Sequence, residues 1–512
     1  MSFTNAHLNV HRNPNEVPFL LDTDTYKATH HFQYNNDIEK MTAYFTFRGP
    51  LNSNDSRIVV FGLRYAIENI LQRRVTQSDI DDAESYLSQH GVMKGRIEWP
   101  KDLWQEVVDV HGGRLPFTVR ALRDGSVVYP GVPVFTISGV GKFAKLTTWL
   151  ETSLMRIWSP SVTATKSRHV WQAVRDAFDD SVDSEFDFLI PSRFHDFGSR
   201  GVSSAETAMT TGMGHLLSFE GTDTMTAGFL ATKWNNGVGV GESVIASEHS
   251  VMTTHDDELT AVRHLINMTP RGQILSVVAD SYDYNNFVFK IVPQIVDEAR
   301  EKGIVFVLRP DSGDPVEAVL TGLEGLSKAF GYTINTKGYK VITGAAVIQG
   351  DGLDLNKVSE ILKAVMSCGY SAQNVAFGMG GGLLQSQTRD TMKAAIKVCS
   401  ITVNGRERAI MKAPKTDSSK ISLPGNMQVN KVYGIPTVFP MTNVGWQDGR
   451  LETDMLETVY SPEGVSWVPE TFQQMRNRLN SEWVKLPKQA HVISNDMYDL
   501  VEKTIRDIDS RK

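Results

Sequence analysis

The stretches ILSVVADSYD (274–283) and IVFVLRPDSG (304–313) decide the fold of this chain, because each runs from a nearly continuous apolar segment into charged or glycine-rich residues. An amphipathic segment separates them. Strands that are apolar along their whole length are typical of parallel sheets with both faces covered by helices. The carboxyl ends of such strands meet at one edge, where α/β barrels hold their active sites. The two stretches therefore predict a parallel α/β sheet with a functional edge.

The same pattern recurs five more times between Phe188 and Gly382. It occurs in FLIPSRFHDFG (188–198), LLSFEGTD (216–223), SVIASEHS (243–250), AVIQGDG (346–352) and NVAFGMGGG (374–382). Four connecting segments have the pattern of helices: 203–217, 284–303, 315–331 and 355–370. Ser203 and Glu206 have the spacing of a capping box, Pro315 suits a first helical turn, and Gly303 suits a helix end. We therefore predict an irregular parallel α/β barrel over residues 186–389.

The flanking segments 1–185 and 390–512 have a mixed α/β texture and are predicted to form a second domain around the barrel. Residues 114–139 contain several short strands broken by Asp-Gly and Pro-Gly turns. Residues 143–160 are apolar at helical spacing, and Pro160 is expected to end that helix. The chain closes with a helical tail.

Composition excludes several classes of protein. The 512 residues are 41% hydrophobic and 22% charged, as in ordinary globular proteins, and the net charge of −7 disfavours a large nucleic-acid surface. The two cysteines form no disulfide framework, which fits a reducing cytoplasm. No apolar run approaches the roughly 20 residues of a membrane span, and the first residues lack a signal-peptide pattern. We therefore expect a cytoplasmic protein without nucleic-acid or membrane partners.

The strand-end residues have the chemistry of a site for a phosphorylated sugar. In LRPDSGDP (308–315), Arg309 can bind a phosphate and Asp311 can bind hydroxyl groups, although a solvated turn with a local ion pair would have the same sequence. Glycines in VIQGDG (347–352) and FGMGGGLL (377–384) let backbone amides approach an anion, but a flexible turn also explains them. Neither segment has Walker A or dinucleotide-fingerprint spacing.

Three other strand ends supply further candidate site residues. Phe197 can stack on a planar ring, with Arg200 nearby for an anion; core packing is the alternative for the phenyl ring. Asp223 can accept a hydrogen bond from an amide, or it caps the next helix. His249 can act as a base, a ligand contact or a phosphoryl acceptor, or it is structural.

Taken together, these motifs resemble the nicotinate/nicotinamide phosphoribosyltransferase family, and within it the enzymes that use nicotinamide. The resemblance runs from LLDTDTYKATHHFQY (20–34) through HDFGSRGVSSAETA (195–208), FEGTDT (219–224) and AFGMGGGLLQSQTRD (376–390) to PKTDSSKISLPG (414–425). It implies a type II phosphoribosyltransferase-like barrel that makes nicotinamide mononucleotide and pyrophosphate from nicotinamide and 5-phosphoribosyl-1-pyrophosphate, with Mg²⁺, for NAD salvage. It also implies a homodimer with shared active sites, and stimulation by ATP through phosphorylation of His249.

The resemblance further implies roles for individual residues. Nicotinamide would lie between Phe197 and the Tyr26 side chain of the other subunit, with Asp223 on its carboxamide. Arg309 and Asp311 would hold the ribose–pyridine side, and Arg200 would contact the substrate. The residues that would line the ribose and phosphate are Gly350, Asp351, Gly380 and Gly381. Those that would line a tunnel and support the site are Ser243, Val244, Ser276 and Asp280. From the other subunit, Arg389 and Lys397 would bind phosphates.

Several alternatives stay open at this point. A nicotinate phosphoribosyltransferase is the nearest one, followed by another barrel enzyme acting on a phosphorylated sugar, and by a catalytically inactive binding protein. The segment 414–420 leaves Lys412, Lys415 and Lys420 as equal candidates for a phosphate contact. The sequence identifies no metal ligands. Asp223 separates the nicotinate alternative from a nicotinamide enzyme, because its carboxylate would repel a substrate carboxylate.

Overall fold

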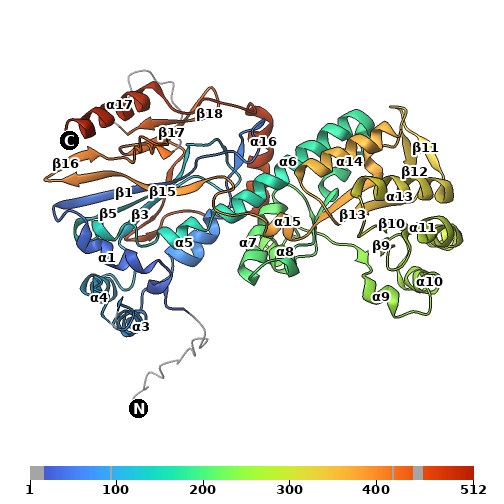
Figure 1. Ribbon diagram of the computed structural model, residues 1–512, viewed down its shortest axis with the longest axis horizontal. Coiled ribbons are helices and arrows are strands. Elements are labelled where there is room, and N and C mark those ends of the chain that lie inside the picture. The colour runs from blue at the N-terminus through green and yellow to red at the C-terminus, as the bar shows by residue number, and fades with distance from the viewer. Residues whose placement is uncertain (1–16, 93–94, 418–419, 442–453, 512) are drawn as a thin grey trace, which may run out of the picture.

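The computed structural model describes residues 17–92, 95–417, 420–441 and 454–511. Two large sheets organise these residues into two lobes that lie side by side in Figure 1. The first sheet is antiparallel and joins strands from both ends of the chain. Its order is β16 (Arg406–Ala409), β15 (Ala394–Val403), β1 (Ile38–Phe47), β5 (Pro133–Val140), β3 (Phe117–Ala121), β19 (Glu457–Ser461) and β20 (Gly464–Val465).

Short helices and two small sheets complete the first lobe. The helices are α1 (Thr25–Gln33), α2 (Leu63–Ala66), α3 (Gln77–Leu87), α4 (Lys101–Asp109), α5 (Glu151–Met155), α16 (Phe472–Lys485) and α17 (Asn495–Asp509). The small sheets pair β2 (Ile58–Val59) with β4 (Val127–Val128), and β17 (Met427–Val432) with β18 (Ile435–Pro440). The predicted run of short strands over 114–139 is confirmed by β3, β4 and β5.

The second sheet is entirely parallel, and each of its seven strands overlaps one of the seven stretches predicted above, although the apolar residues 188–190 and 216 belong to helical segments and not to strands. Its order is β7 (Gly221–Thr222), β6 (Phe194–Asp196), β14 (Val375–Met379), β13 (Ala345–Gln349), β10 (Val305–Arg309), β9 (Ile274–Val278) and β8 (Ile245–Ala246). The sheet curls, because Glu242, just before β8, bridges back to Gly221 of β7.

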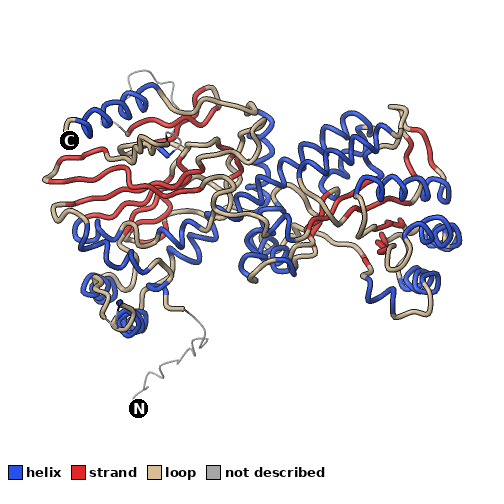
Figure 2. Tube along the Cα trace, in the orientation of Figure 1, coloured by secondary structure: helices blue, strands red, loops and turns tan. Residues whose placement is uncertain are grey.

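Helices surround this parallel sheet, as Figure 2 shows in the right-hand lobe. They are α6 (Trp158–Ser181), α7 (Ala205–Leu216), α8 (Met225–Trp234), α9 (His249–Thr253), α10 (Glu258–Met268), α11 (Tyr284–Asn286), α12 (Val296–Lys302), α13 (Pro315–Phe330), α14 (Leu355–Ser367) and α15 (Gly381–Leu384). A hairpin of β11 (Tyr332–Ile334) and β12 (Lys340–Ile342) follows α13. Every residue of β14, which lies between β6 and β13 inside the sheet, is buried. The predicted curled parallel α/β fold with a further mixed α/β region is confirmed.

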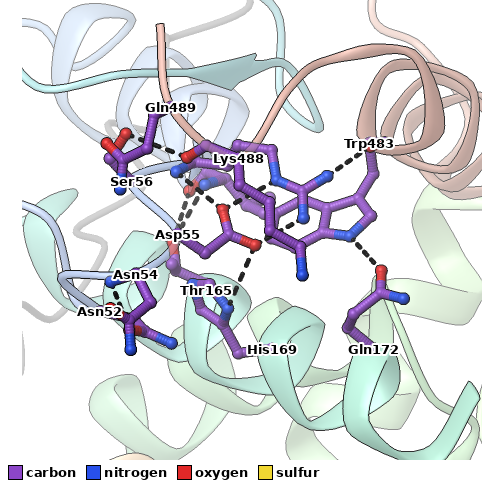
Figure 3. Close-up of polar contacts among 12 residues, drawn as sticks. Asn52, Asn54, Asp55, Ser56, Thr165, His169, Gln172, Trp483, Lys488 and Gln489 are labelled. Carbon is purple, nitrogen blue, oxygen red and sulfur yellow. Dashed lines mark hydrogen bonds and ion pairs between the residues drawn. The ribbon is translucent and has the colours of Figure 1, made fainter. Parts of the chain in front are cut away.

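A buried polar junction ties helix α16, near the C-terminus, to α6 and to residues 55–57 of the N-terminal segment. Figure 3 shows Asp55, His169, Gln172 and Trp483 around it. The Asp55 carboxylate accepts from Arg57 Nε at 2.8 Å, and the Arg57 guanidinium lies 3.8 Å from the centre of the Trp483 ring. Trp483 Nε1 donates to Gln172 at 2.9 Å, and burial lowers the pKa of His169 to about 4. This junction is one reason why both chain ends belong to one lobe.

Three local predictions differ from the structure. Helix α7 is capped by Ser204, whose hydroxyl accepts from the Thr207 amide, because the Ser203 amide instead donates to Gln385. Pro160 ends no helix; it lies in the first turn of α6, where its missing N–H is tolerated. The segment 284–303 is four short helical pieces, of which the last ends at left-handed Gly303 as predicted.

Among the described residues, no helix is long and apolar enough to cross a membrane.

Candidate active site

A pocket of about 740 Å³ opens at the carboxyl edge of the parallel sheet. Its walls come from the loops that follow six strands: β6, β7, β8, β10, β13 and β14. Nine of the predicted residues line it: Phe197, Arg200, Asp223, Arg309, Asp311, Gly350, Asp351, Gly380 and Gly381. The sheet therefore brings together residues that are almost 190 positions apart in the sequence.

The Phe197 ring has a fixed place on one wall of the pocket. The backbone amide of Phe197 donates to the Met379 carbonyl at 3.0 Å, and this hydrogen bond joins the end of β6 to β14. A Cβ atom built on Gly378 would lie 2.0 Å from Phe197 Cε2, so only glycine leaves room for the ring. Sequence reasoning did not single out Gly378; the signal was a glycine inside a buried strand, which often marks a close approach.

Asp223 presents a carboxylate on another wall. Its amide donates to the Asp196 carbonyl at 2.9 Å, and its Oδ1 accepts a short hydrogen bond from the Ser243 hydroxyl. In the described part of the chain, Oδ2 accepts no hydrogen bond. Helix α8 is capped at Thr224 without a side-chain hydrogen bond, so the alternative role of Asp223 as a helix cap is excluded.

Asp196 binds the segments that carry both Phe197 and Asp223, a role that the sequence did not reveal. Its buried Oδ1 accepts from the Gly198 amide at 2.7 Å, just beyond Phe197, and Oδ2 accepts from Thr222 at 3.4 Å. Burial raises the pKa of this carboxyl group to about 6. Asp196 thus joins the turn that carries Phe197 to the strand that carries Asp223.

The third part of the edge is a group of acidic residues around His249, the first residue of α9. His249 Nε2 lies 3.5 Å from Asp311 Oδ2 and 3.9 Å from Asp280 Oδ1, while Nδ1 shares a hydrogen bond of 3.0 Å with Ser281. Asp280 Oδ2 accepts from the Asp311 amide at 3.0 Å, whereas its buried Oδ1 has no hydrogen-bond partner among the described residues. Arg309 Nη2 lies 3.7 Å from Asp311 Oδ2. The geometry places one imidazole and one guanidinium against two carboxylates.

Glycine backbone forms the remaining wall. A Cβ atom on Gly201 would lie 3.0 Å from the Gly381 nitrogen, so the segments 198–201 and 380–382 pack backbone against backbone. A Cβ atom on Gly350 would lie 3.7 Å from the Phe197 ring and 3.8 Å from Asp311 Oδ1, which places these three residues in one corner. This wall offers unhindered main chain to an anionic ligand.

Five predicted residues on or beside the second sheet are not among those that line this pocket: Ser243, Val244, His249, Ser276 and Asp280. Ser276 is buried within β9, where its carbonyl accepts from the Ser247 amide at 2.9 Å. Val244 is half-buried just before β8. Ser243 acts on the pocket only through its hydrogen bond to Asp223.

Three predicted residues lie in the first lobe and likewise do not line the pocket: Tyr26 on α1, Arg389, and Lys397 on β15. The Tyr26 side chain is 58% exposed. Burial lowers the pKa of Lys397; the carboxylate of Glu151 raises it in part, and the cations Arg48, Lys412 and Lys27 lower it. The antiparallel sheet therefore carries its own cluster of cations, to which Lys412 belongs.

Metal-binding geometry is limited in the described residues, where no group of three or more His, Cys, Asp or Glu side chains could hold an ion. The cysteines take no part in the site, since Cys399 is buried and Cys368 is exposed, and both are free.

Comparisons with known proteins agree with this geometry. Residues 192–443 match the model of the nicotinate phosphoribosyltransferase (NAPRTase) family, and residues 18–119 match the nicotinamide phosphoribosyltransferase N-terminal domain. The chain is 38% identical to the nicotinamide phosphoribosyltransferase of Xanthomonas campestris pv. campestris over 80% of its own length and 86% of that protein. It is 32% identical to the enzyme of the same name from Acinetobacter baylyi, over 89% and 96% of the two chains.

Solved structures share the fold. Nicotinate-nucleotide pyrophosphorylase from Pyrococcus furiosus is similar with a TM-score of 0.61 and 15% identity, over 94% of this chain and 99% of that one. Human nicotinic acid phosphoribosyltransferase gives a TM-score of 0.60 and 16% identity, with the same coverage.

Proposed function

The chain belongs to the nicotinamide phosphoribosyltransferase family, and we propose that it makes nicotinamide mononucleotide, a precursor of NAD, from nicotinamide and 5-phosphoribosyl-1-pyrophosphate. The pyridine nitrogen forms a bond to C1 of the ribose, the bond from C1 to the pyrophosphate oxygen breaks, and pyrophosphate leaves with both electrons. One observation carries the choice of base: the Asp223 carboxylate lines the same pocket as the Phe197 ring.

Ring binding and selection of the amide follow from these two side chains. The face of Phe197 offers a neutral aromatic ring a stacking surface. Asp223, whose Oδ1 is engaged by Ser243, offers Oδ2 to the N–H of a carboxamide. A nicotinate carboxylate in the same place would meet a like charge about 4 Å away, which costs about 4 kcal/mol at an effective dielectric constant of about 20. The pocket is open to solvent, so screening reduces this figure.

The other residues of the pocket suit the charge changes of this transfer. Positive charge develops on the ribose as its bond to pyrophosphate breaks, and the carboxylates of Asp311 and Asp351 can stabilise that charge. Negative charge develops on the leaving pyrophosphate, towards which Arg200 and Arg309 supply guanidinium groups. Gly350, Gly380 and Gly381 supply backbone without side-chain obstruction. Positioning and electrostatics then account for catalysis without a covalent intermediate.

Magnesium fits this edge as an ion that arrives with the substrate. Mg²⁺ is usually held by one or two carboxylates together with substrate phosphates. The unpartnered buried Oδ1 of Asp280 and the carboxylate of Asp311 are the oxygen donors that fit this role. When bound, the ion would neutralise charge on the pyrophosphate.

We further propose that ATP stimulates the reaction by phosphorylating His249. The imidazole is half exposed at the mouth of the site, and its Nδ1 is oriented by Ser281. Nε2 would take the γ-phosphoryl group of ATP, ADP would leave, and water would later cleave the P–N bond. The two carboxylates within 4.0 Å of Nε2 make the phosphorylated state electrostatically different from the free one. Through this electrostatic difference, phosphorylation of His249 would change the affinity of the site for its substrates.

We also propose a homodimer in which each site is completed by the partner. Arg200 and Arg309 are the only cationic residues among those lining the pocket in the described part of the chain, whereas the donor carries several phosphate charges. The cations of the first lobe, Lys397 with Arg48 and Lys412, would supply the missing positive charge from the second subunit. Tyr26 and Arg389 would reach the pocket in the same way. The free cysteines fit a cytoplasmic protein.

The test compares nicotinamide and nicotinate, each with 5-phosphoribosyl-1-pyrophosphate and Mg²⁺, in the wild type and in Asp223→Asn. We expect the wild type to prefer nicotinamide and the variant to lose at least about tenfold of that preference. Thr222→Ser, at the neighbouring residue, controls for local disturbance. Product from nicotinate alone would favour the nicotinate enzyme, and product from neither base would favour a binding protein.

A further inference from the structure

The glycine wall of the pocket is thin, because a second cavity lies directly behind it. This second cavity has a volume of about 410 Å³ and shares Leu353, Met379 and Gly382 with the active-site pocket. Lys166 of helix α6 lines the second cavity. A wall with open space on both sides lacks the close packing that usually fixes main chain in a protein interior. Polar contacts from this side therefore add to the backbone packing of Gly381 against Gly201 in fixing the position of the wall.

Side chains of α6 supply those contacts to the carbonyl groups of α15, the short helix that continues the glycine segment. Lys166 Nζ donates to the Gly382 carbonyl at 3.1 Å and to the Ser386 carbonyl at 3.5 Å. Thr163 Oγ1 donates to the Leu383 carbonyl at 3.3 Å. Figure 1 shows the two helices near each other at the junction of the lobes, and they are in contact.

Gln387 connects these contacts into one network. Its Oε1 accepts from Lys166 Nζ at 2.9 Å, and its Nε2 donates to Thr163 Oγ1 at 2.8 Å and to the Leu384 carbonyl at 3.1 Å. Three consecutive carbonyls, those of Gly382, Leu383 and Leu384, are thus bound by α6 and Gln387, and Lys166, Gly382 and Leu383 line the second cavity. Thr163 and Gln387 are buried. The network leaves the pocket-facing side of the wall free for a ligand.

Lys166 is the charged member of this network. All three of its acceptors are uncharged oxygens, and burial lowers the pKa of its amine to about 8. An ammonium group against carbonyls at the carboxyl end of a helical turn is a favourable arrangement. Lys166 is partly buried without a carboxylate among its acceptors, so its hydrogen bonds to these oxygens are what offset the cost of removing its charge from water.

We propose that Lys166, with Thr163 and Gln387, is a positioning residue that holds the Gly380–Gly382 backbone from behind, so that this wall meets the phosphate groups of the phosphoribosyl donor. The effect on catalysis rests on the proposed function. The claim that Lys166 holds the glycine wall in position does not rest on the proposed function, because it concerns only the structure of the wall. Lys166 touches no substrate and acts through the main chain of residues 380–387.

Kinetics on the full-length protein separate this role from a general structural one. Lys166→Met keeps the length and the apolar stem of the side chain but removes the donors. We expect it to raise KM for 5-phosphoribosyl-1-pyrophosphate about tenfold or more, with less than about a twofold change in KM for nicotinamide. Lys166→Arg should restore most of the loss. Lys363→Met, at an exposed lysine on α14, is the matched control.

Amide hydrogen exchange tests the wall without reference to activity. The Leu383 amide donates to the Gly380 carbonyl at 3.0 Å, and the Gln385 amide donates to the Gly381 carbonyl at 2.8 Å. In Lys166→Met and in Thr163→Val, which removes only the hydroxyl link, we expect exchange at these amides to quicken at least about tenfold while β14 stays protected.

Unchanged exchange in both variants would overturn the proposal, as would equal rises in both KM values. If the wild type made no product from either base, the proposed function would fail, and the exchange data would still decide whether Lys166 holds the wall.

Discussion

Mixing two inactive variants tests whether each active site is built from two subunits. Asp311→Asn removes a carboxylate from the pocket, and Lys397→Ala removes a cation from the antiparallel sheet of the other lobe. A lysine about 4 Å from a phosphate contributes about 4 kcal/mol at an effective dielectric constant of about 20. Each variant alone should therefore lose roughly a hundred- to a thousandfold in kcat/KM, because both sites of its dimer carry the same lesion.

The expected recovery follows from two-fold symmetry. Random exchange of equal amounts makes about half of all dimers hybrids, and each hybrid has one site with both lesions and one site with none. About a quarter of all sites are then intact, so the mixture should regain about a quarter of wild-type activity. Hybrids isolated by two different affinity tags should reach about half. A site built within a single chain would always retain one lesion, so no recovery in verified hybrids would refute the shared-site reasoning.

Three further predictions concern single residues. His249→Ala should keep a basal rate but lose stimulation by ATP, measured as product formed with and without ATP; stimulation at the wild-type level would contradict the phosphoryl-acceptor role. Gly378→Ala should displace the Phe197 ring, since its Cβ atom would lie 2.0 Å from Cε2, and should raise KM for nicotinamide about tenfold or more; an unchanged KM would show that the ring is not the stacking surface. Asp196, with its raised pKa of about 6 against 3.8, binds a proton more tightly when folded, so its contribution to the unfolding free energy should fall by about 2 kcal/mol between pH 4 and 6. Asp196→Asn should flatten that fall in urea titrations across this range, and an equally steep fall in the variant would refute the assignment.

The seven strands of the parallel sheet were predictable because their signal is local. A buried parallel strand must be apolar along its length, and it ends where polar or glycine residues begin, as β10 does at Arg309; before Asp223 only the short strand Gly221–Thr222 forms. Helix α13 was predictable for a similar reason, since Pro315 favours its first turn and Gly331 follows its last residue. The resemblance to a family rested on the same strand-end motifs, so most of the pocket-lining residues came with the fold.

Errors arose where a contact distant in sequence overrode a local signal. Ser203 has the spacing of a helix cap, but its amide is taken by Gln385, 182 positions later, and Ser204 caps α7 instead.

The sequence by itself determined the elements of the parallel sheet, the edge at which the polar residues gather, and the family, because each depends on residue types at short spacing. Only the tertiary structure decided that Gly378 makes room for Phe197, that Asp196 supports two walls, and that Lys166 holds the glycine wall from behind. These relations join strands and helices that are distant in the chain, and no periodicity encodes which side chains face each other across them. The same holds for the antiparallel sheet, in which residues near 40 and 400 lie side by side because hydrogen bonding pairs β1 with β15.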